Sequence, residues 1–157
     1  MNKIAVVILN WNGKKLLEQF LPSVTKFSNK EWAEVIVADN DSTDDSIDFL
    51  KSHYPDLKTI ILDKNYGFAE GYNRALDQLD HEYFVLLNSD VEVSEKWLDP
   101  IYELFEKEAD IAAVQPKIKA FNKIRKGFLP RFLMMIIQFS KFLWIQTKFS
   151  GHLNMRM

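Results

Sequence analysis

Apolar runs and amphipathic segments alternate regularly along the first 116 residues of this 157-residue chain. Short continuous apolar runs, typical of strands covered on both faces, occur at residues 4–9, 35–38, 59–62, 83–87 and 111–114. Between them, apolar residues recur at helical spacing in segments 16–24, 42–50, 68–79 and 94–105. This alternation predicts right-handed βαβ units and a mainly parallel sheet, and therefore the α/β fold class.

Polar residues cluster where the predicted strands end. The turns after the first four strands read Asn10-Trp11-Asn12-Gly13, Asp39-Asn40-Asp41-Ser42, Asp63-Lys64-Asn65-Tyr66-Gly67 and Asn88-Ser89-Asp90. Each turn alone is ordinary, because Asn, Asp and Gly favour turns. The carboxyl ends of parallel strands share one edge of the sheet, where open α/β sheets bind ligands. We therefore expect the four turns to line a single crevice.

The residue types in these turns indicate a particular ligand chemistry. Asp90 places a carboxylate at the end of a buried strand, which suits a hard divalent cation that shares its oxygen ligands with substrate phosphates. Trp11 offers an aromatic face. Acidic turns would repel a diphosphate unless a cation bridged the charges. The pattern predicts a phosphorylated ligand that carries a base and binds together with Mg²⁺ or Mn²⁺.

Charge is distributed unevenly, although the net charge is only -2. Residues 1–110 contain all 22 acids and 11 bases, whereas residues 111–157 contain nine bases and no acid.

The apolar content of 47% predicts one globular domain. The absence of cysteine excludes disulfides and thiolate metal sites and fits a reducing compartment. The N-terminus lacks the cleavage site of a signal peptide.

Other nucleotide-binding and hydrolytic motifs do not fit. After the first predicted strand only Gly13 is present, so the glycine pattern of a dinucleotide-binding Rossmann domain is missing. The sequence has neither a P-loop nor a Gly-x-Ser-x-Gly elbow, and its three histidines form no ligand pattern. A phosphate receiver domain would use Asp63, but it also needs acids after the first strand, where Asn10 and Asn12 are neutral.

Four segments resemble the family 2 inverting glycosyltransferases, particularly the rhamnosyltransferase-like branch that builds bacterial surface polysaccharides. The segments are Val6–Gly13, Val35–Asp44, Asn65–Ala75 and Leu86–Val91, in the order and spacing of the family. The resemblance covers residues 4–116. It implies the GT-A fold, a Rossmann-like three-layer arrangement with a mainly parallel sheet, with residues 1–116 as its nucleotide-sugar-binding half.

The resemblance implies roles for the turns after the first two strands. Trp11 stands where the family usually has tyrosine and would stack on a pyrimidine ring, with Asn10 and Asn12 beside it in the nucleotide-sugar site. Asp39 would accept a hydrogen bond from the ring N–H of uracil or thymine; the alternative is an aspartate that caps a helix. At Asp41 the family more often has glycine.

The resemblance also assigns roles in the third and fourth turns. Gly67 would allow the backbone to approach the nucleotide, or is simply a turn glycine, and Asn73 would hold that loop. Asp90 is the last residue of the Asp-x-Asp motif of the family and would ligate the metal. Asn88 replaces the first aspartate of that motif and would contact the ribose or the metal shell.

The implied reaction is a direct displacement at the anomeric carbon of a UDP- or dTDP-sugar by a hydroxyl of a glycan or lipid-linked acceptor. The family places the general base in an acidic pair well downstream of Asp-x-Asp, and this sequence has no acid after Asp110. We therefore identify no general base and expect slow transfer or none. The alternatives are a catalytically defective nucleotide-binding remnant and a module that docks to a membrane or a partner. No nucleic-acid partner is expected.

Residues 117–157 depart from the family and are basic and apolar. Three explanations compete: the product of a reading-frame slip, a helix on an anionic membrane surface through residues 118–148, and a core helix. Arg131, Gln138 and Lys141 interrupt the apolar stretch too often for a transmembrane span. We expect a cytoplasmic protein. If the second explanation holds, the protein lies peripherally on the inner face of the cell membrane.

Overall fold

A six-stranded sheet forms the centre of the computed structural model, which describes residues 3–108, 110–116 and 134–138. The strand order is β3-β2-β1-β4-β6-β5. The strands are β1 (Ile4–Asn10), β2 (Ala33–Asp39), β3 (Lys58–Ile61), β4 (Tyr83–Asn88), β5 (Ala113–Val114) and β6 (Met134–Gln138). The helices are α1 (Lys14–Phe27), α2 (Ser46–His53), α3 (Gly67–Leu76) and α4 (Asp99–Lys107). The first four strands run parallel to one another, whereas β6 pairs antiparallel with β4 and β5.

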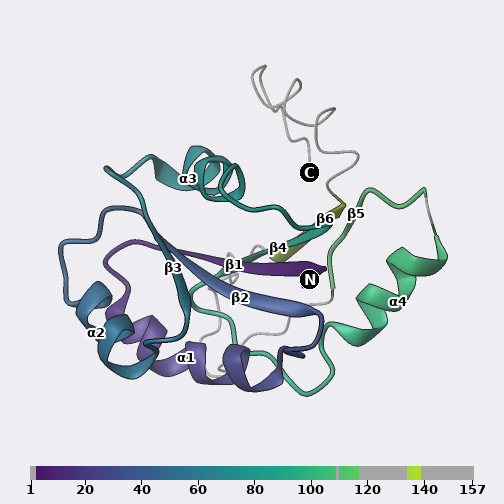
Figure 1. The fold of residues 1–157 in the computed structure, drawn as a ribbon, viewed down its shortest axis with the longest axis horizontal. Helices are drawn as coiled ribbons and strands as arrows, with labels where there is room; N and C mark the ends of the chain where they lie inside the picture. Colours follow the sequence, from purple (N-terminus) through teal and green to yellow (C-terminus); the bar gives the residue numbers. More distant parts are fainter. Residues whose placement is uncertain (1–2, 109, 117–133, 139–157) are drawn as a thin grey trace, which may run out of the picture.

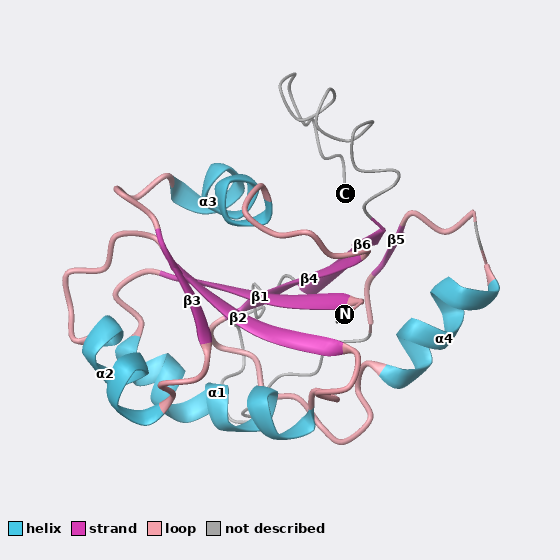
Figure 2. Cartoon of the chain, viewed as in Figure 1, coloured by secondary structure: helices cyan, strands magenta, loops and turns pink. Residues whose placement is uncertain are grey.

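Helices cover both faces of the sheet, as Figures 1 and 2 show. Alternate residues of β1 point to opposite faces. Ile4, Val6 and Ile8 pack with α1, α2 and α4, whereas Ala5 and Val7 pack with α3. Because both faces of β1 are buried, its sequence is continuously apolar instead of alternating. The three-layer arrangement and the mainly parallel sheet confirm the predicted fold class.

The chain changes faces at the centre of the sheet. The helices after β1 and β2 lie on one face, and α3, which leads from β3 to β4, lies on the other (Figure 1). β4 therefore lies beside β1 on the side opposite to β2. Open α/β sheets bind ligands outside the carboxyl ends of the strands at such a reversal. The fold places this position between the ends of β1 and β4.

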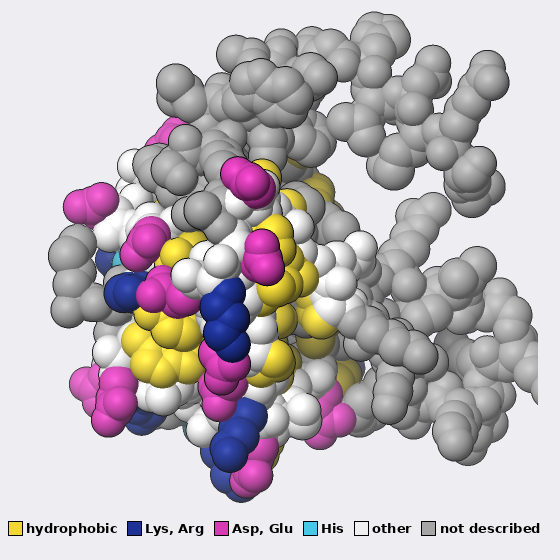
Figure 3. All heavy atoms as spheres, turned by 90° about the vertical axis from the view of Figure 1, so that its right-hand side faces the viewer, with side chains coloured by type: hydrophobic (Ala, Val, Ile, Leu, Met, Phe, Trp, Pro, Cys, Tyr) yellow, Lys and Arg dark blue, Asp and Glu magenta, His cyan; other side chains and the backbone are white. Residues whose placement is uncertain are grey.

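Helix α4 is anchored at the amino ends of the strands, away from that position. Lys3 Nζ lies 3.3 Å from Glu106 Oε1, and the Tyr83 hydroxyl donates a hydrogen bond to the same oxygen at 3.2 Å. The rings of Trp32 and Tyr102 stack with their centroids 5.0 Å apart. The surface on this side shows apolar side chains bordered by charged groups of both signs (Figure 3).

Several expectations from the sequence differ from the structure. The helix predicted over residues 94–105 begins only at Asp99, and the helix predicted over residues 68–79 ends at Leu76. The strand predicted at 111–114 is limited to 113–114. The helix predicted from residue 42 begins at Ser46, because Ser42 bonds to Asp39 in the preceding turn. A helix through the apolar tail is wrong for residues 134–138, which form β6. The remaining tail, 117–133 and 139–157, lies outside the described residues. Within the described ranges, no helix is long and apolar enough to span a bilayer.

Candidate functional site

The parallel register brings the predicted turns to one edge of the sheet. Asn10, the last residue of β1, is paired with Asp39, the last residue of β2, and Leu9 is paired with Asn88 at the end of β4. The turns after β1, β2 and β4 therefore begin at nearly the same level. The expected convergence of the polar strand ends is confirmed for these three turns.

A buried network joins the ends of β1 and β2. Asp39 is 0% exposed and accepts three hydrogen bonds. The Ser42 backbone N–H donates to its Oδ1 at 2.8 Å, while the Ser42 hydroxyl and Asn10 Nδ2 donate to its Oδ2 at 2.7 and 2.9 Å. Asn10 is also 0% exposed. Asn10 and Asp39 thus brace the turns from inside, and the predicted contact between Asp39 and a pyrimidine would compete with these bonds.

The turn that carries Trp11 is tied to the turn after β2. Asn12 has a left-handed backbone with φ 49°. Its N–H donates to Ser42 Oγ at 2.8 Å, and its Oδ1 accepts from the Thr43 N–H at 2.7 Å. Trp11, in contrast, is 57% exposed. The network therefore holds the backbone on both sides of Trp11 while its indole faces outward, as a stacking platform requires.

Asp44 connects the first turns of α1 and α2. Its Oδ2 accepts from the Lys14 N–H and its Oδ1 from the Ser46 N–H, each at 3.0 Å. Partial burial alone would raise the pKa of Asp44, but the hydrogen bonds from Ser46 and Lys14 outweigh burial and lower it. An ionised carboxylate at two helix N-termini is stabilised by the helix dipoles as well.

Asn40 holds the loop after β3, a role that the sequence analysis missed. Its side-chain amide bonds to Asn65, Tyr66 and Gly67. Gly67 has φ +72°, and an added Cβ would meet nothing within 4 Å. This open space leaves room for a ligand, and the close approach of a nucleotide to Gly67 stays a prediction. Asn73, the residue expected to hold this loop, lies partly buried on α3.

Asn40 and Ser42 share a sequence feature that could have indicated their hydrogen-bonding roles. Both follow a largely buried strand in a turn whose polar side chains are short enough to bond to neighbouring backbone groups. Their partners lie far along the chain, at residues 10–12 and 65–67. The pattern of residue types marks a turn, but it does not show which distant segment each amide or hydroxyl contacts.

Asp90 is the carboxylate best placed to hold a cation. Asn88 and Asp90 are both partly buried at the end of β4. Asp90 Oδ1 is buried and has no hydrogen-bond partner among the described residues. Burial raises the pKa of Asp90, and a hydrogen bond from its own backbone N–H opposes this shift. A buried oxygen without a donor is an oxygen that a cation would satisfy, so this residue fits the predicted metal.

The described residues supply no complete metal cage. They contain no cluster of three His, Asp or Glu side chains that could hold an ion. Mg²⁺ is commonly bound by one or two carboxylates together with substrate phosphates. A single protein carboxylate at this position is therefore compatible with a cation that arrives with a diphosphate.

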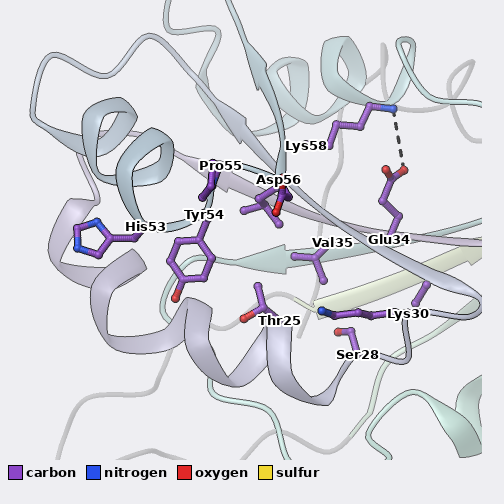
Figure 4. Close-up of a pocket in the computed structure, with 12 residues that line it drawn as sticks. Thr25, Ser28, Lys30, Glu34, Val35, His53, Tyr54, Pro55, Asp56 and Lys58 are labelled. Atoms are coloured by element: carbon purple, nitrogen blue, oxygen red, sulfur yellow. Dashed lines mark ion pairs between the residues drawn. The ribbon is translucent and has the colours of Figure 1, made fainter.

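A hollow of about 380 Å³ opens near the amino ends of β2 and β3, opposite to the polar turns. It lies beside the ends of α1 and α2 and the starts of β2 and β3 (Figure 4). Its lining includes Lys30, Tyr54 and the pair Lys58–Glu34, whose Nζ and Oε2 atoms are 4.0 Å apart. This hollow is remote from the polar turns and forms no part of the predicted site.

Sequence comparison identifies relatives of the chain. A sequence model described as "Glycosyl transferase family 2" matches residues 5–154. The chain is 29% identical over 98 residues to the teichoic acid poly(glycerol phosphate) polymerase of Staphylococcus epidermidis, covering 60% of this chain and 14% of the relative. It is 27% identical over 124 residues to the poly-beta-1,6-N-acetyl-D-glucosamine synthase of the same species, covering 76% and 29%. The chain spans 14 to 36% of the length of its curated relatives.

Solved structures share the fold. The crystal structure of S. aureus TarS 1-349 in complex with UDP-GlcNAc matches with a TM-score of 0.68 and 24% identity, over 80% of this chain and 37% of that chain. The mannosyltransferase PcManGT from Pyrobaculum calidifontis, in complex with GDP-Man and Mn²⁺, matches with a TM-score of 0.61 and 20% identity, over 71% and 34%. At these identities the likeness concerns the arrangement of strands and helices.

Proposed function

Because the chain belongs to glycosyl transferase family 2 and has the GT-A fold, we propose that it binds a UDP- or dTDP-sugar and serves inverting sugar transfer. The observation that carries the proposal is the position of Asp90. Its buried, unpartnered Oδ1 lies at the end of β4, beside the reversal of strand order, among the residues that the structure describes. This is where an α/β sheet binds its ligand.

The turns around Asp90 supply the proposed contacts to the donor. Trp11 would stack on the pyrimidine, with Asn12 fixing its backbone. Gly67 would admit the nucleotide close to the main chain because no described residue lies within 4 Å of a Cβ added there. Asn88, partly buried two residues before Asp90, would contact the ribose. Asn10, Asp39 and Asn73 remain proposed members of this site, the first two acting from beneath the turns.

A divalent cation, Mg²⁺ or Mn²⁺, is the proposed cofactor. Asp90 would hold it, and the donor diphosphate would complete its ligands. When bound, the cation would stabilise the negative charge that develops on the leaving nucleoside diphosphate. The Mn²⁺ in the PcManGT complex supports this proposal, as does the lack of a donor to Asp90 Oδ1 among the described residues.

The relatives support a role in building bacterial cell-surface polymers. Two of them are named for teichoic acid and for poly-beta-1,6-N-acetyl-D-glucosamine. We propose a glycan or lipid-linked acceptor, a rhamnosyltransferase-like specificity, and a cytoplasmic location at the inner face of the membrane. Peripheral contact through residues 118–148 belongs to the same proposal.

Calorimetry of the whole chain with UDP and with dTDP tests the proposal, in the presence of Mn²⁺ or of a chelator. We expect binding that is stronger with Mn²⁺, and we expect Asp90→Ala to remove the metal dependence. Equal affinity with and without the cation would remove the metal from the site. Failure to bind either nucleotide would contradict donor binding itself.

Turnover is a separate measurement on the same preparation. Release of UDP or dTDP from a sugar nucleotide with an added glycan reports transfer. Binding without release would favour the second candidate, a nucleotide-binding module without catalysis. Residues 111–157 contain nine bases and no acid, so no carboxylate of that segment can serve as the general base.

A further inference from the structure

Asn40 connects segments that lie far apart in the sequence. It follows directly after β2 and is 2% exposed. Its backbone N–H donates to the carbonyl of Asn10 at 2.8 Å. Its side-chain Nδ2 donates to Asn65 Oδ1 at 3.0 Å and to the carbonyl of Gly67 at 2.9 Å. Its Oδ1 accepts from the Tyr66 N–H at 2.9 Å. One buried amide therefore bonds to every residue of the 65–67 turn.

The close approach of α3 fixes the position of this amide. A Cβ added to Gly71 would lie 3.1 Å from Asn40 Nδ2 and 3.1 Å from Leu9 Cδ2. Such distances leave little room for Asn40 to move toward the helix. Within the turn, Asn65 Oδ1 also accepts the Gly67 N–H at 2.7 Å. The conformation of Gly67, with its positive φ, thus depends on a side chain that α3 confines on one side.

We infer that Asn40 is a positioning residue that holds the 65–67 turn in the shape that receives the donor nucleotide. The inference rests on the proposed function, since the turn matters for binding only if Gly67 lines the donor site. Asn40 is too deeply buried to touch a ligand, so it acts through the turn.

The chemistry of the contact requires an amide. Asn40 uses two donors and one acceptor, a combination that asparagine provides in one short side chain. An aspartate has the same shape but no donor when ionised. It would place a negatively charged oxygen against Asn65 Oδ1 and the Gly67 carbonyl, which are both acceptors. Losing partners in a buried position is costly.

The substitution Asn40→Asp tests the inference, with Asn29→Asp as the matched control. Both variants change the charge equally, but the bond at position 29, in which Oδ1 accepts from the Glu31 N–H, survives in an aspartate. We expect Asn40→Asp to weaken UDP and dTDP binding by roughly tenfold or more, equivalent to about 1.4 kcal/mol. Asn29→Asp should bind like the wild type.

Two further readouts separate positioning from a loss of folding. Hydrogen exchange at the Tyr66 and Gly67 amides should become faster in Asn40→Asp at temperatures where circular dichroism shows a folded chain. The affinity of the variant relative to the wild type should also recover as the pH falls, because a protonated carboxyl regains one donor. A purely structural role would lower the unfolding temperature without changing the affinity of the folded fraction.

Gly71→Ala provides a second approach if Asn40→Asp does not fold. The added methyl group presses on Asn40 without altering its chemistry, so affinity should fall in the same direction. If the wild type binds nucleotide and a folded Asn40→Asp or Gly71→Ala variant binds it equally well, the inference about Asn40 is wrong. The proposed function would still stand. A wild type that binds neither nucleotide would contradict the proposed function and the inference with it.

Discussion

Asp41 has a left-handed backbone, with φ +63°, in the turn after β2, and its side chain is exposed. This conformation costs an ordinary L-residue about 1–2 kcal/mol, while glycine adopts it freely. We expect Asp41→Gly to be more stable than Asp41→Ala by about 1 kcal/mol in urea denaturation. Asp56 is exposed and lacks a positive φ, so Asp56→Gly should be less stable than Asp56→Ala. If the glycine variant were the more stable one at both positions, the backbone explanation would be wrong.

Asp39 has hydrogen-bond partners inside the protein that the sequence does not reveal. The resemblance marked it as a ligand contact, yet the structure buries it and surrounds it with Asn10 and Ser42 donors. Asp39→Ala would leave these donors without a partner, so we expect a loss of about 1–3 kcal/mol in the free energy of unfolding. Chemical denaturation without nucleotide measures it. If stability is unchanged while nucleotide affinity falls, Asp39 acts on the ligand directly.

The junction of β1 and α1 depends on the small size of Gly13. Its φ of -112° is one that any residue adopts, so backbone freedom does not explain the glycine. A Cβ there would overlap Asn10 Oδ1, and Asn10 is held by Asp39 and Ser42. We expect Gly13→Ala to cost about 1–3 kcal/mol through overpacking. In denaturation experiments on an Asn10→Ala background, the cost should shrink; an undiminished cost would show that Asn10 is not the obstacle.

The first four strands and their helices could be predicted from the sequence because burial on both faces leaves continuous apolar runs with polar turns between them. Residues 134–138 show the limit. An apolar run of this kind fits a buried helix as well as a strand, and β6 is defined by its antiparallel pairing with β4, a distant segment of the chain. The start of α2 was misplaced for a similar reason, since Ser42 bonds to Asp39.

At the scale of the whole molecule, the convergence of the polar turns was predictable from the sequence, whereas the contacts within them were not. Parallel strands must present their carboxyl ends at one edge, so the convergence of the turns followed from topology. Which side chains are buried under the turns and which remain exposed depends on tertiary contacts. Trp11 faces outward, whereas Asn10 and Asp39 are enclosed. Hydrogen-bond geometry across distant segments decides that division.

His81, near the amino ends of the strands, should make the stability of the whole molecule depend on pH. Burial lowers the pKa of His81, although the Glu34 carboxylate, whose Oε2 lies 3.1 Å from Nε2, pulls it upward. Its Nδ1 is buried and has no partner in the described part of the chain. A histidine whose folded pKa lies below its unfolded value of 6.5 binds protons more readily when unfolded, so stability is lost as the pH falls through that value.

We therefore expect the free energy of unfolding in urea to fall between about pH 7.5 and about pH 5.5, the range in which histidine titrates. His81→Gln keeps a donor for Glu34 but does not titrate, so its stability should fall less over the same range. His53→Gln, the same change at an exposed position, should behave like the wild type. If the ion pair with Glu34 outweighed burial, acidification would stabilise the wild type, and this account of His81 would be wrong.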